Sequence, residues 1–250
     1  MIRWMFQGIL RDKTRSLFPF LVVTLGVALM IALIGFMEGV FMDLIDITAN
    51  LDTGHLRFTN KPFYDEEHLN PLDRALAGKN KTRQWLKSGD IQWMPRIRWT
   101  AIMDVPNERG ETRSQTPVAG LAIDLFSPES QELRRLKLAK SLVSGKLPSS
   151  SGEMLVGYLL AETLRLKPGD VVTLVGQSFD GGMATGNYVV SGFVRFGSFV
   201  MDKKMALIDI ADAQHTFYME DMVTDWLGFF PAHVSYEEYD RVKNDLQSRL

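Results

Sequence analysis

Residues 17–37 read LFPFLVVTLGVALMIALIGFM, and no charged side chain interrupts this stretch. A helix of this length rises about 31 Å at 1.5 Å per residue, which is enough to cross a hydrocarbon core of about 30 Å. A cleaved signal peptide has a shorter apolar core, about 7–15 residues, followed by a small-x-small cleavage site, and a buried core helix is rarely so uniformly apolar. The stretch therefore predicts a retained transmembrane helix.

Charge changes sign across this predicted span. Residues 1–16 hold four basic residues and one acidic residue, whereas the first charged residues after the span are Glu38, Asp43 and Asp46. By the positive-inside rule, the N-terminus lies in the cytoplasm and the bulk of the chain lies outside. Residues 1–16 also mix apolar and basic side chains, which predicts a short cytoplasmic helix at the membrane interface.

The helical period continues beyond the span on the apolar side chains of residues 40, 41, 44, 45 and 48. This pattern predicts a stalk helix over residues 38–52. Small residues within the span would let another helix approach closely in the bilayer. The candidate positions for packing against a partner helix are Gly26, Ala28, Ala32 and Gly35.

Beyond residue 53 the pattern changes to short alternating strands and amphipathic helices. Strands are expected at 55–59, 91–98, 114–121, 152–156, 171–175, 188–194, 205–208 and 225–230, and helices at 73–87, 157–166, 209–218 and 236–250. The expected fold class is α+β: a mixed α/β extracytoplasmic domain preceded by one N-terminal transmembrane helix and a stalk.

The residues give no sign of an enzyme. The chain has no cysteine, and its histidines at 55, 68, 215 and 233 lack metal-ligand spacing. Glycines 181, 182 and 186 lack the lysine and Ser/Thr of a phosphate-binding loop and indicate a hairpin tip. The basic residues at 134–140 alternate with leucines, as on an amphipathic surface helix. We expect no catalytic residue, no metal, no cofactor and no nucleic-acid partner.

The segment from Ser144 to Leu174 resembles the signature of the extracytoplasmic core domain in MacB/FtsX-type ABC transporter permeases, which include the LolC/LolE lipoprotein-release subunits. SGKLP at 144–148, GEMLVG at 152–157, LRLKPGD at 164–170 and VTL at 172–174 occur in the order of that signature. MPRI at 94–97, VAGLAID at 118–124, YVVSGF at 188–193 and ALIDIADAQ at 206–214 resemble further family motifs. The resemblance is weakest at residues 56–90. The positions that carry it are Gly145, Pro148, Gly152, Glu153, Gly157, Gly169, Asp170, Gly192, Asp209 and Asp212.

These signature positions have structural explanations that do not depend on the family. Gly145 and Gly152 permit turns around a small strand, residues 168–170 end a helix and open a hairpin, and Asp212 could cap or line a helix N-terminus. The signature therefore identifies an architecture and names no catalytic group.

The resemblance implies a periplasmic core domain over residues 53–250, with an α/β part at about 53–135 and 215–250 and an inserted β-rich part at about 140–210. It also implies a permease subunit of the bacterial inner membrane that pairs with itself or with a sister permease. A cytoplasmic ABC ATPase would drive its membrane helices, and the stalk would carry the motion to the outer domain, a coupling called mechanotransmission. Lipoprotein, lipid, peptide or drug cargo is handled outside the membrane in such systems.

Two features restrict this expectation. Family members have three more spans after the outer domain, whereas this sequence ends at Leu250, so an incomplete permease is expected. The hairpin at 175–188 lacks the basic and proline residues of the loop that recruits a periplasmic carrier, so a carrier or adaptor is left open. The alternative is a single-pass, membrane-anchored periplasmic binding or scaffold protein without an ATPase. A membrane-anchored hydrolase is a third and weaker hypothesis, because no nucleophile, base and orienting group can be assembled.

Overall fold

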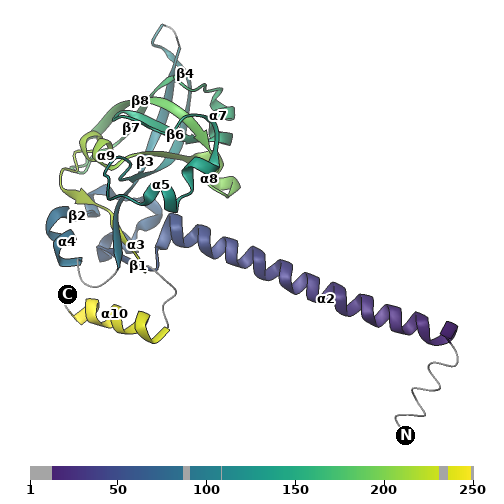
Figure 1. Cartoon of the computed structure of the whole chain (residues 1–250). Coiled ribbons are helices and arrows are strands. Elements are labelled where there is room, and N and C mark those ends of the chain that lie inside the picture. Colours follow the sequence, from purple (N-terminus) through teal and green to yellow (C-terminus); the bar gives the residue numbers. More distant parts are fainter. Residues whose placement is uncertain (1–12, 87–90, 108, 231–235, 249–250) are drawn as a thin grey trace. The chain divides into compact units, whose positions relative to one another are not determined.

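A computed structural model describes residues 13–86, 91–107, 109–230 and 236–248 of the chain (Figure 1). The chain divides into two units, Met1–Thr48 and Ala49–Leu250, and each is described by itself. Most of the interfacial helix predicted for residues 1–16 lies outside the described residues.

The first unit is the helix α2, Lys13–Thr48. Within it, Leu17–Phe41 has a mean hydropathy of 2.7 and, among the described residues, is the one helix long and apolar enough to cross a membrane. None of this segment is buried within the chain, which suits a surface meant for lipid or for other helices. A Cβ added at Gly26 or Gly35 would meet no atom within 4 Å. The packing face for a partner helix therefore stays a prediction.

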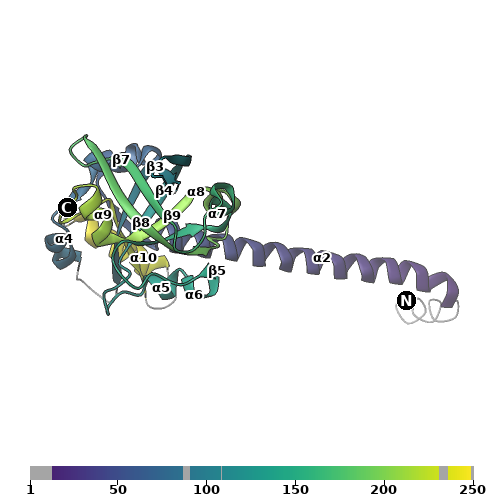
Figure 2. The same ribbon diagram turned by 90° about the horizontal axis from the view of Figure 1, so that it is seen from above.

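The second unit is built on a nine-stranded sheet that closes partly on itself. Six of its strands form a ring. In order round the ring they are β3 (Gln92–Pro106), β4 (Thr112–Ile123), β9 (Met205–Asp209), β6 (Glu153–Gly157), β8 (Met183–Val194) and β7 (Val171–Gln177). Each pairs with the next, and β7 returns to β3 through residues 101–104 and 173–176. Figure 2 shows β7 and β8 side by side in this barrel.

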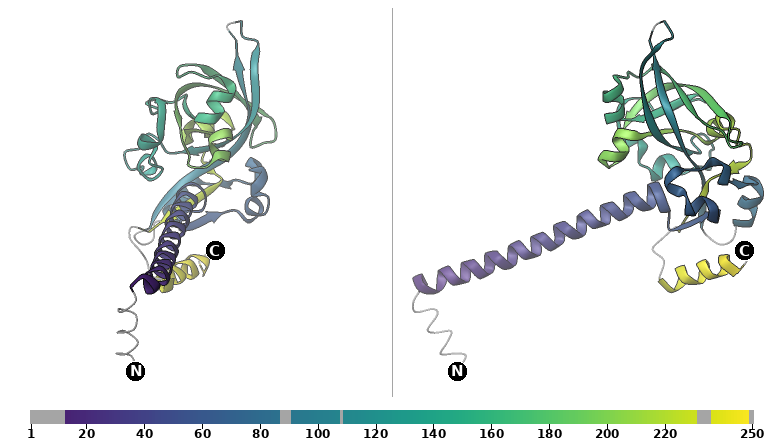
Figure 3. Two further views of the ribbon diagram at one scale, coloured as in Figure 1. Left: turned by 90° about the vertical axis from the view of Figure 1, so that its right-hand side faces the viewer. Right: turned by 180° about the vertical axis from the view of Figure 1, so that it is seen from behind.

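The other strands extend the barrel at its margins. The first half of β3 pairs with β11 (Asp225–Phe229), which pairs with the edge strand β1 (Leu56–Thr59). At the other end of the order, β5 (Leu142–Gly145) pairs with β8. The separate pair β2 (Leu76–Ala77) and β10 (Met222–Val223) forms a small second sheet. The β3–β4 hairpin extends past the neighbouring strands (Figure 3).

Short helices connect and cover these strands. They are the π-helix η1 (Ala49–Thr53), the 3-10 helices η2 (Glu67–Leu69) and η3 (Leu72–Arg74), and the α-helices α3 (Lys61–Asp65), α4 (Lys79–Leu86), α5 (Glu132–Arg135), α6 (Leu138–Ser141), α7 (Tyr158–Leu164), α8 (Phe199–Lys204), α9 (Ile210–Thr216) and α10 (Tyr236–Ser248).

The predicted α+β class is confirmed, with differences in individual elements. The helix predicted at 73–87 is broken, because residues 76–77 pair with β10 and Gly78 has a positive φ of 74°. The single surface helix expected at 134–140 is wrong, since Lys137 adopts a left-handed conformation between α5 and α6. Residues 140–210, expected as an insertion, supply β5 to β9 to the same sheet as β3 and β4. The division into two parts stays a prediction.

The centre of the barrel depends on a glycine opposite a tryptophan. Trp99 on β3 faces Gly120 on β4 in the strand register, and its side chain is fully buried. A Cβ at residue 120 would lie 1.9 Å from two atoms of the Trp99 indole. The Phe217 ring also packs against the Trp99 indole, with 5.6 Å between the two ring centroids. The glycine in the VAGLAID motif therefore provides the room that the indole occupies.

Gly169 illustrates a different requirement, because it has φ of 100° with no atom within 4 Å of an added Cβ. A β-branched residue would fit the space but not the backbone conformation. We expect Gly169→Val to lower the free energy of unfolding by about 1–3 kcal/mol. Thermal unfolding of the detergent-solubilised chain measures this, with Lys167→Val in the same turn as the control. Equal melting temperatures for the two variants would contradict the prediction.

Candidate functional site at the start of the core domain

The first residues of the second unit form a tight turn that directs the chain into the sheet. The π-helix η1 follows α2 in the chain, and the N–H of Gly54 closes it by donating to the carbonyl of Ala49 at 2.8 Å. Leu51 within η1 is buried. A helix leaves its last carbonyls without intrahelical donors, and they carry partial negative charge. The carbonyls of η1 therefore need partners from outside the helix.

Arg96 on β3 supplies those partners. Its Nη2 donates to the carbonyl of Asn50 at 2.7 Å, and its Nη1 donates to the carbonyl of Leu51 at 2.8 Å. The same guanidinium holds Glu132 with two bonds, Nε to Oε1 at 2.9 Å and Nη2 to Oε2 at 2.8 Å. The two side chains are 0% and 1% exposed. A rigid guanidinium fork is suited to bridging two carbonyls and one carboxylate at once.

Arg98 makes a second set of bonds from the same face of β3. It donates to both the carboxylate and the backbone carbonyl of Asp52, and its Nε donates to Oδ2 of the fully buried Asp225 at 3.1 Å. Burial by itself lowers the pKa of Arg98, but the negative charges of Asp225 and then Asp52 outweigh burial. The pKa of Arg98 is therefore raised above its usual value. The Thr224 hydroxyl lies 2.9 Å from Asp225 Oδ2 and accepts a hydrogen bond from the backbone N–H of Arg98 at 3.0 Å.

Together these contacts form what we call the η1 clamp: Arg96 and Arg98 of β3, with Asp52, Glu132 and Asp225. The clamp holds residues 50, 51 and 52 of η1 to one strand. That strand continues into the barrel and pairs there with β4 and β7. The clamp therefore links η1 to a strand of the barrel. Removing one member of a buried ion pair is costly, whereas replacing both by apolar residues of similar volume often is not.

The signature residues lie elsewhere, in the strands β5, β6, β8 and β9, in α9 and in neighbouring loops. Asp209, rather than Asp212, is the N-cap of α9: its carboxylate accepts from the N–H of Ala211 and of Leu125, each at 2.9 Å. Burial raises the pKa of Asp209, although these hydrogen bonds oppose the rise. Asp212 lies within α9 and accepts from the N–H of Gly152 at 2.8 Å. The two carboxylates thus fix α9 to neighbouring loops.

The remaining signature positions are close-packed backbone or turn residues. A Cβ at Gly145 or Gly157 would lie 2.3 Å from a neighbouring carbonyl oxygen, and one at Gly192 would lie 2.8 Å from two. Glu153 accepts from the N–H of Ser149, which holds its pKa below the usual value. The other three, Pro148, Gly169 and Asp170, lie in loops between elements. In the described part of the chain, none of these ten signature residues forms a hydrogen bond with Arg96 or Arg98.

In the sequence, Arg96 stands out only as part of the MPRI motif, and the motif does not indicate its partners. Glu132, Asp225 and Asp52 were not predicted as site residues. One signal was present, because an arginine between Pro95 and Ile97 in an apolar strand indicates a buried, paired charge. Its partners could not be found this way, since they lie at distant positions in the chain.

The residues considered for chemistry do not assemble into a site. Within the described part of the chain, no group of three His, Cys, Asp or Glu residues is placed to hold a metal ion. His233 lies outside the described residues. Gly181 and Gly182 lie in the turn between β7 and β8, at the hairpin tip expected for them. Gly186, which was expected at the same tip, lies within β8.

Comparison with known proteins identifies this architecture. A sequence model of the MacB-like periplasmic core domain matches residues 16–233. The chain belongs to this family. Among solved structures, it is similar to the periplasmic region of MacB from Actinobacillus actinomycetemcomitans, with 13% identity and a TM-score of 0.50, over 77% of this chain and 81% of that chain. That likeness concerns the fold alone. No curated protein matches the sequence.

Membership of the MacB-like family sets the class of function. The domain points to an ABC transporter permease family, in which the domain itself is not enzymatic. One N-terminal apolar helix followed by a MacB-like periplasmic domain fits an inner-membrane protein with most of its mass in the periplasm.

Proposed function

We propose that this MacB-like chain is a permease subunit of an ABC transporter in the bacterial inner membrane. ATP hydrolysis by a separate cytoplasmic subunit moves α2, and the η1 clamp passes this movement to the periplasmic barrel. The domain then acts on lipoprotein, lipid, peptide or drug cargo outside the membrane. The observation that supports this most strongly is Arg96, which binds the carbonyls of Asn50 and Leu51 while paired with Glu132.

The proposal includes a second permease subunit, identical or related, in the same bilayer. Gly26, Ala28, Ala32 and Gly35 are the small residues of α2 at which a partner helix would pack closely. A periplasmic carrier or adaptor is a further possible partner. Its binding residues are not assigned, because the β7–β8 turn carries no basic or proline residue between Val175 and Tyr188.

The orientation can be tested with reporter fusions. We expect alkaline phosphatase fused after residue 100 to be active, because the basic residues before Leu17 keep the N-terminus in the cytoplasm. A green fluorescent protein fusion at the same position should be dark if it is exported unfolded. A bright fluorescent fusion with inactive phosphatase would contradict the orientation.

The coupling itself can be tested in the transporter assembled with its ATPase. We expect an ATPase encoded beside this chain to co-purify with it in detergent. Asp52→Ala should leave that association intact while weakening the contact between η1 and Arg98, so transport falls relative to ATP hydrolysis. A matched control is Asp73→Ala, which removes an exposed carboxylate that pairs with its neighbour Arg74. Failure to recover any ATPase would favour the scaffold alternative.

A further inference from the structure

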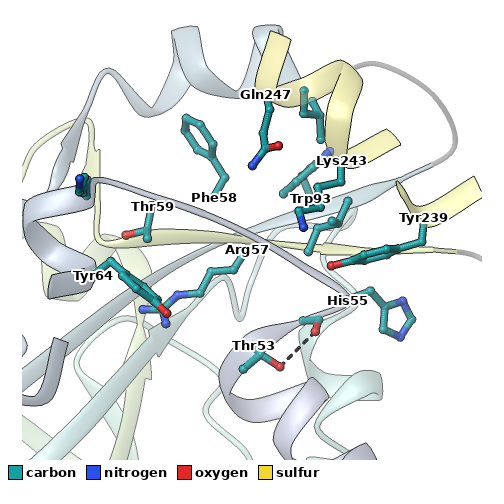
Figure 4. Close-up of a pocket in the computed structure, with 14 residues that line it drawn as sticks. Thr53, His55, Arg57, Phe58, Thr59, Tyr64, Trp93, Tyr239, Lys243 and Gln247 are labelled. Carbon is teal, nitrogen blue, oxygen red and sulfur yellow. Dashed lines mark hydrogen bonds between the residues drawn. The ribbon is translucent and has the colours of Figure 1, made fainter. Parts of the chain in front are cut away.

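A cavity of about 670 Å³ lies along β1, the edge strand of the large sheet (Figure 4). Every residue from Thr53 to Thr59 lines it, together with side chains from α3, β3 and α10. Its volume falls within the range typical of small-molecule sites. Successive side chains of β1 lie on opposite sides of the strand, so Phe58 faces the α10 side of the cavity and Arg57 the other.

The α10 side of the cavity combines an apolar surface with hydrogen-bond donors. Phe58, Trp93 and Leu246 are half-buried there, and Phe58 packs on Trp85 at 5.3 Å. The indole N–H of Trp93 is buried and has no acceptor among the residues that the structure describes. Lys243 of α10 also lines the cavity, and no carboxylate among the described residues pairs with it.

The charge of the lining is one-sided. Arg57, Lys61 and Lys243 line the cavity, and none of the described residues that line it is acidic, although the chain as a whole has more acidic than basic residues. Arg57 is already engaged, since its Nη1 donates to Glu67 at 2.6 Å and its Nη2 lies 4.0 Å from Asp225. Among the described residues of α10 that line the cavity, Lys243 is the basic one, and it is left to pair with a ligand. A buried donor without an acceptor costs free energy that a bound acceptor would recover.

We propose that this cavity binds an amphiphile with one apolar chain and an anionic head group, a carboxylate or a phosphate. The head group would accept from the Trp93 indole N–H and pair with the Lys243 ammonium. The apolar chain would lie against Phe58 and Leu246. A neutral ligand would leave the ammonium unpaired, and a fully polar anion would leave the apolar surface exposed. The inference needs only the cavity and holds whether or not the chain is a transporter.

The test uses the full-length chain in phosphatidylcholine nanodiscs with a diazirine-bearing oleate as the probe. After photolysis, we expect cross-links within residues 53–59, at Trp93 or within residues 239–247, located by peptide mass spectrometry. Oleate should compete for this labelling about tenfold better than oleyl alcohol, which has the same chain and no charge, as a charge-assisted hydrogen bond implies. Equal competition by the two, or labelling confined to residues 17–41, would overturn the proposal.

Variants separate the head-group contacts from general surface charge. Lys243→Glu should lower labelling of the cavity about tenfold, and Lys243→Arg should keep it. Trp93→Phe keeps an aromatic ring and removes the donor, so labelling should fall by severalfold. The matched control is Lys203→Glu, which reverses an exposed lysine on α8 and should label like the native chain. If Lys243→Glu labels no less than Lys203→Glu, the cavity does not bind anions.

Discussion

Replacing Arg96 with methionine is expected to lower the free energy of unfolding by about 3–5 kcal/mol. The change leaves the Glu132 carboxylate, 1% exposed, without its partner. It also removes the donors to the carbonyls of Asn50 and Leu51. Thermal and chemical unfolding of the detergent-solubilised chain, followed by circular dichroism, measures the loss.

Two further variants make this result specific to the clamp. Arg134→Met removes an exposed arginine from α5 and should change stability by no more than about 0.5 kcal/mol. The double variant Arg96→Met with Glu132→Met should regain much of the loss, because apolar replacements leave no buried charge. A single variant as stable as the native chain, or a double variant less stable than the single, would argue against a buried pair.

Gly120→Val is expected to destabilise the barrel by about 3 kcal/mol or more, because overpacking forces neighbouring side chains and strands to shift. The new Cβ would lie 1.9 Å from the Trp99 indole, and Trp99 is fully buried between β3 and its neighbours. Rotation of the indole is restricted by its contact with Phe217. Unfolding monitored by far-ultraviolet circular dichroism gives the change.

A double-mutant cycle identifies the cause. In a Trp99→Ala background the indole is gone, so Gly120→Val should cost much less than it does in the native chain. Equal costs of Gly120→Val in both backgrounds would mean that the tryptophan contact is not responsible.

Local sequence patterns predicted most elements of this protein. The uncharged stretch at 17–37 lies within α2, and the alternating residues of β4, β6, β7 and β9 lie within a few positions of their predicted strands. Errors came where a long-range contact outweighs local preference. Residues 76–77 form a strand because residues 222–223 pair with them, which no periodicity in 73–87 could indicate.

The closure of the barrel was beyond sequence reasoning for a similar reason. It depends on β3 pairing with β7, where Ala101 meets Gly176 and Asp104 meets Thr173. Gly176 permits the approach, since a Cβ there would lie 3.0 Å from the Thr100 carbonyl oxygen. An alternating pattern identifies a strand, but it does not specify the strand's partner.

The η1 clamp was not predicted from the sequence, although Arg96 lies in the MPRI motif. The predicted stalk ends at residue 52, and the backbone is helical to Thr48 in α2 and continues in η1 to Thr53. That this segment acts as a stalk stays a prediction. What joins that backbone to the sheet is a set of charged residues at 96, 98, 132 and 225. Each is an ordinary surface residue type, and only the folded chain places them together.

We infer that the η1 clamp holds η1 firmly to the barrel strand β3. Because the chain contains no cysteine, spin labels can be attached at Thr53→Cys in η1 and Glu162→Cys in α7 without other changes. Electron–electron double resonance on the labelled chain in nanodiscs measures the distance between the two labels. We expect one narrow distance distribution for the otherwise native chain and a clearly broader one when Arg96→Met is added. A broad distribution in the native chain, or one that Arg96→Met leaves unchanged, would contradict it.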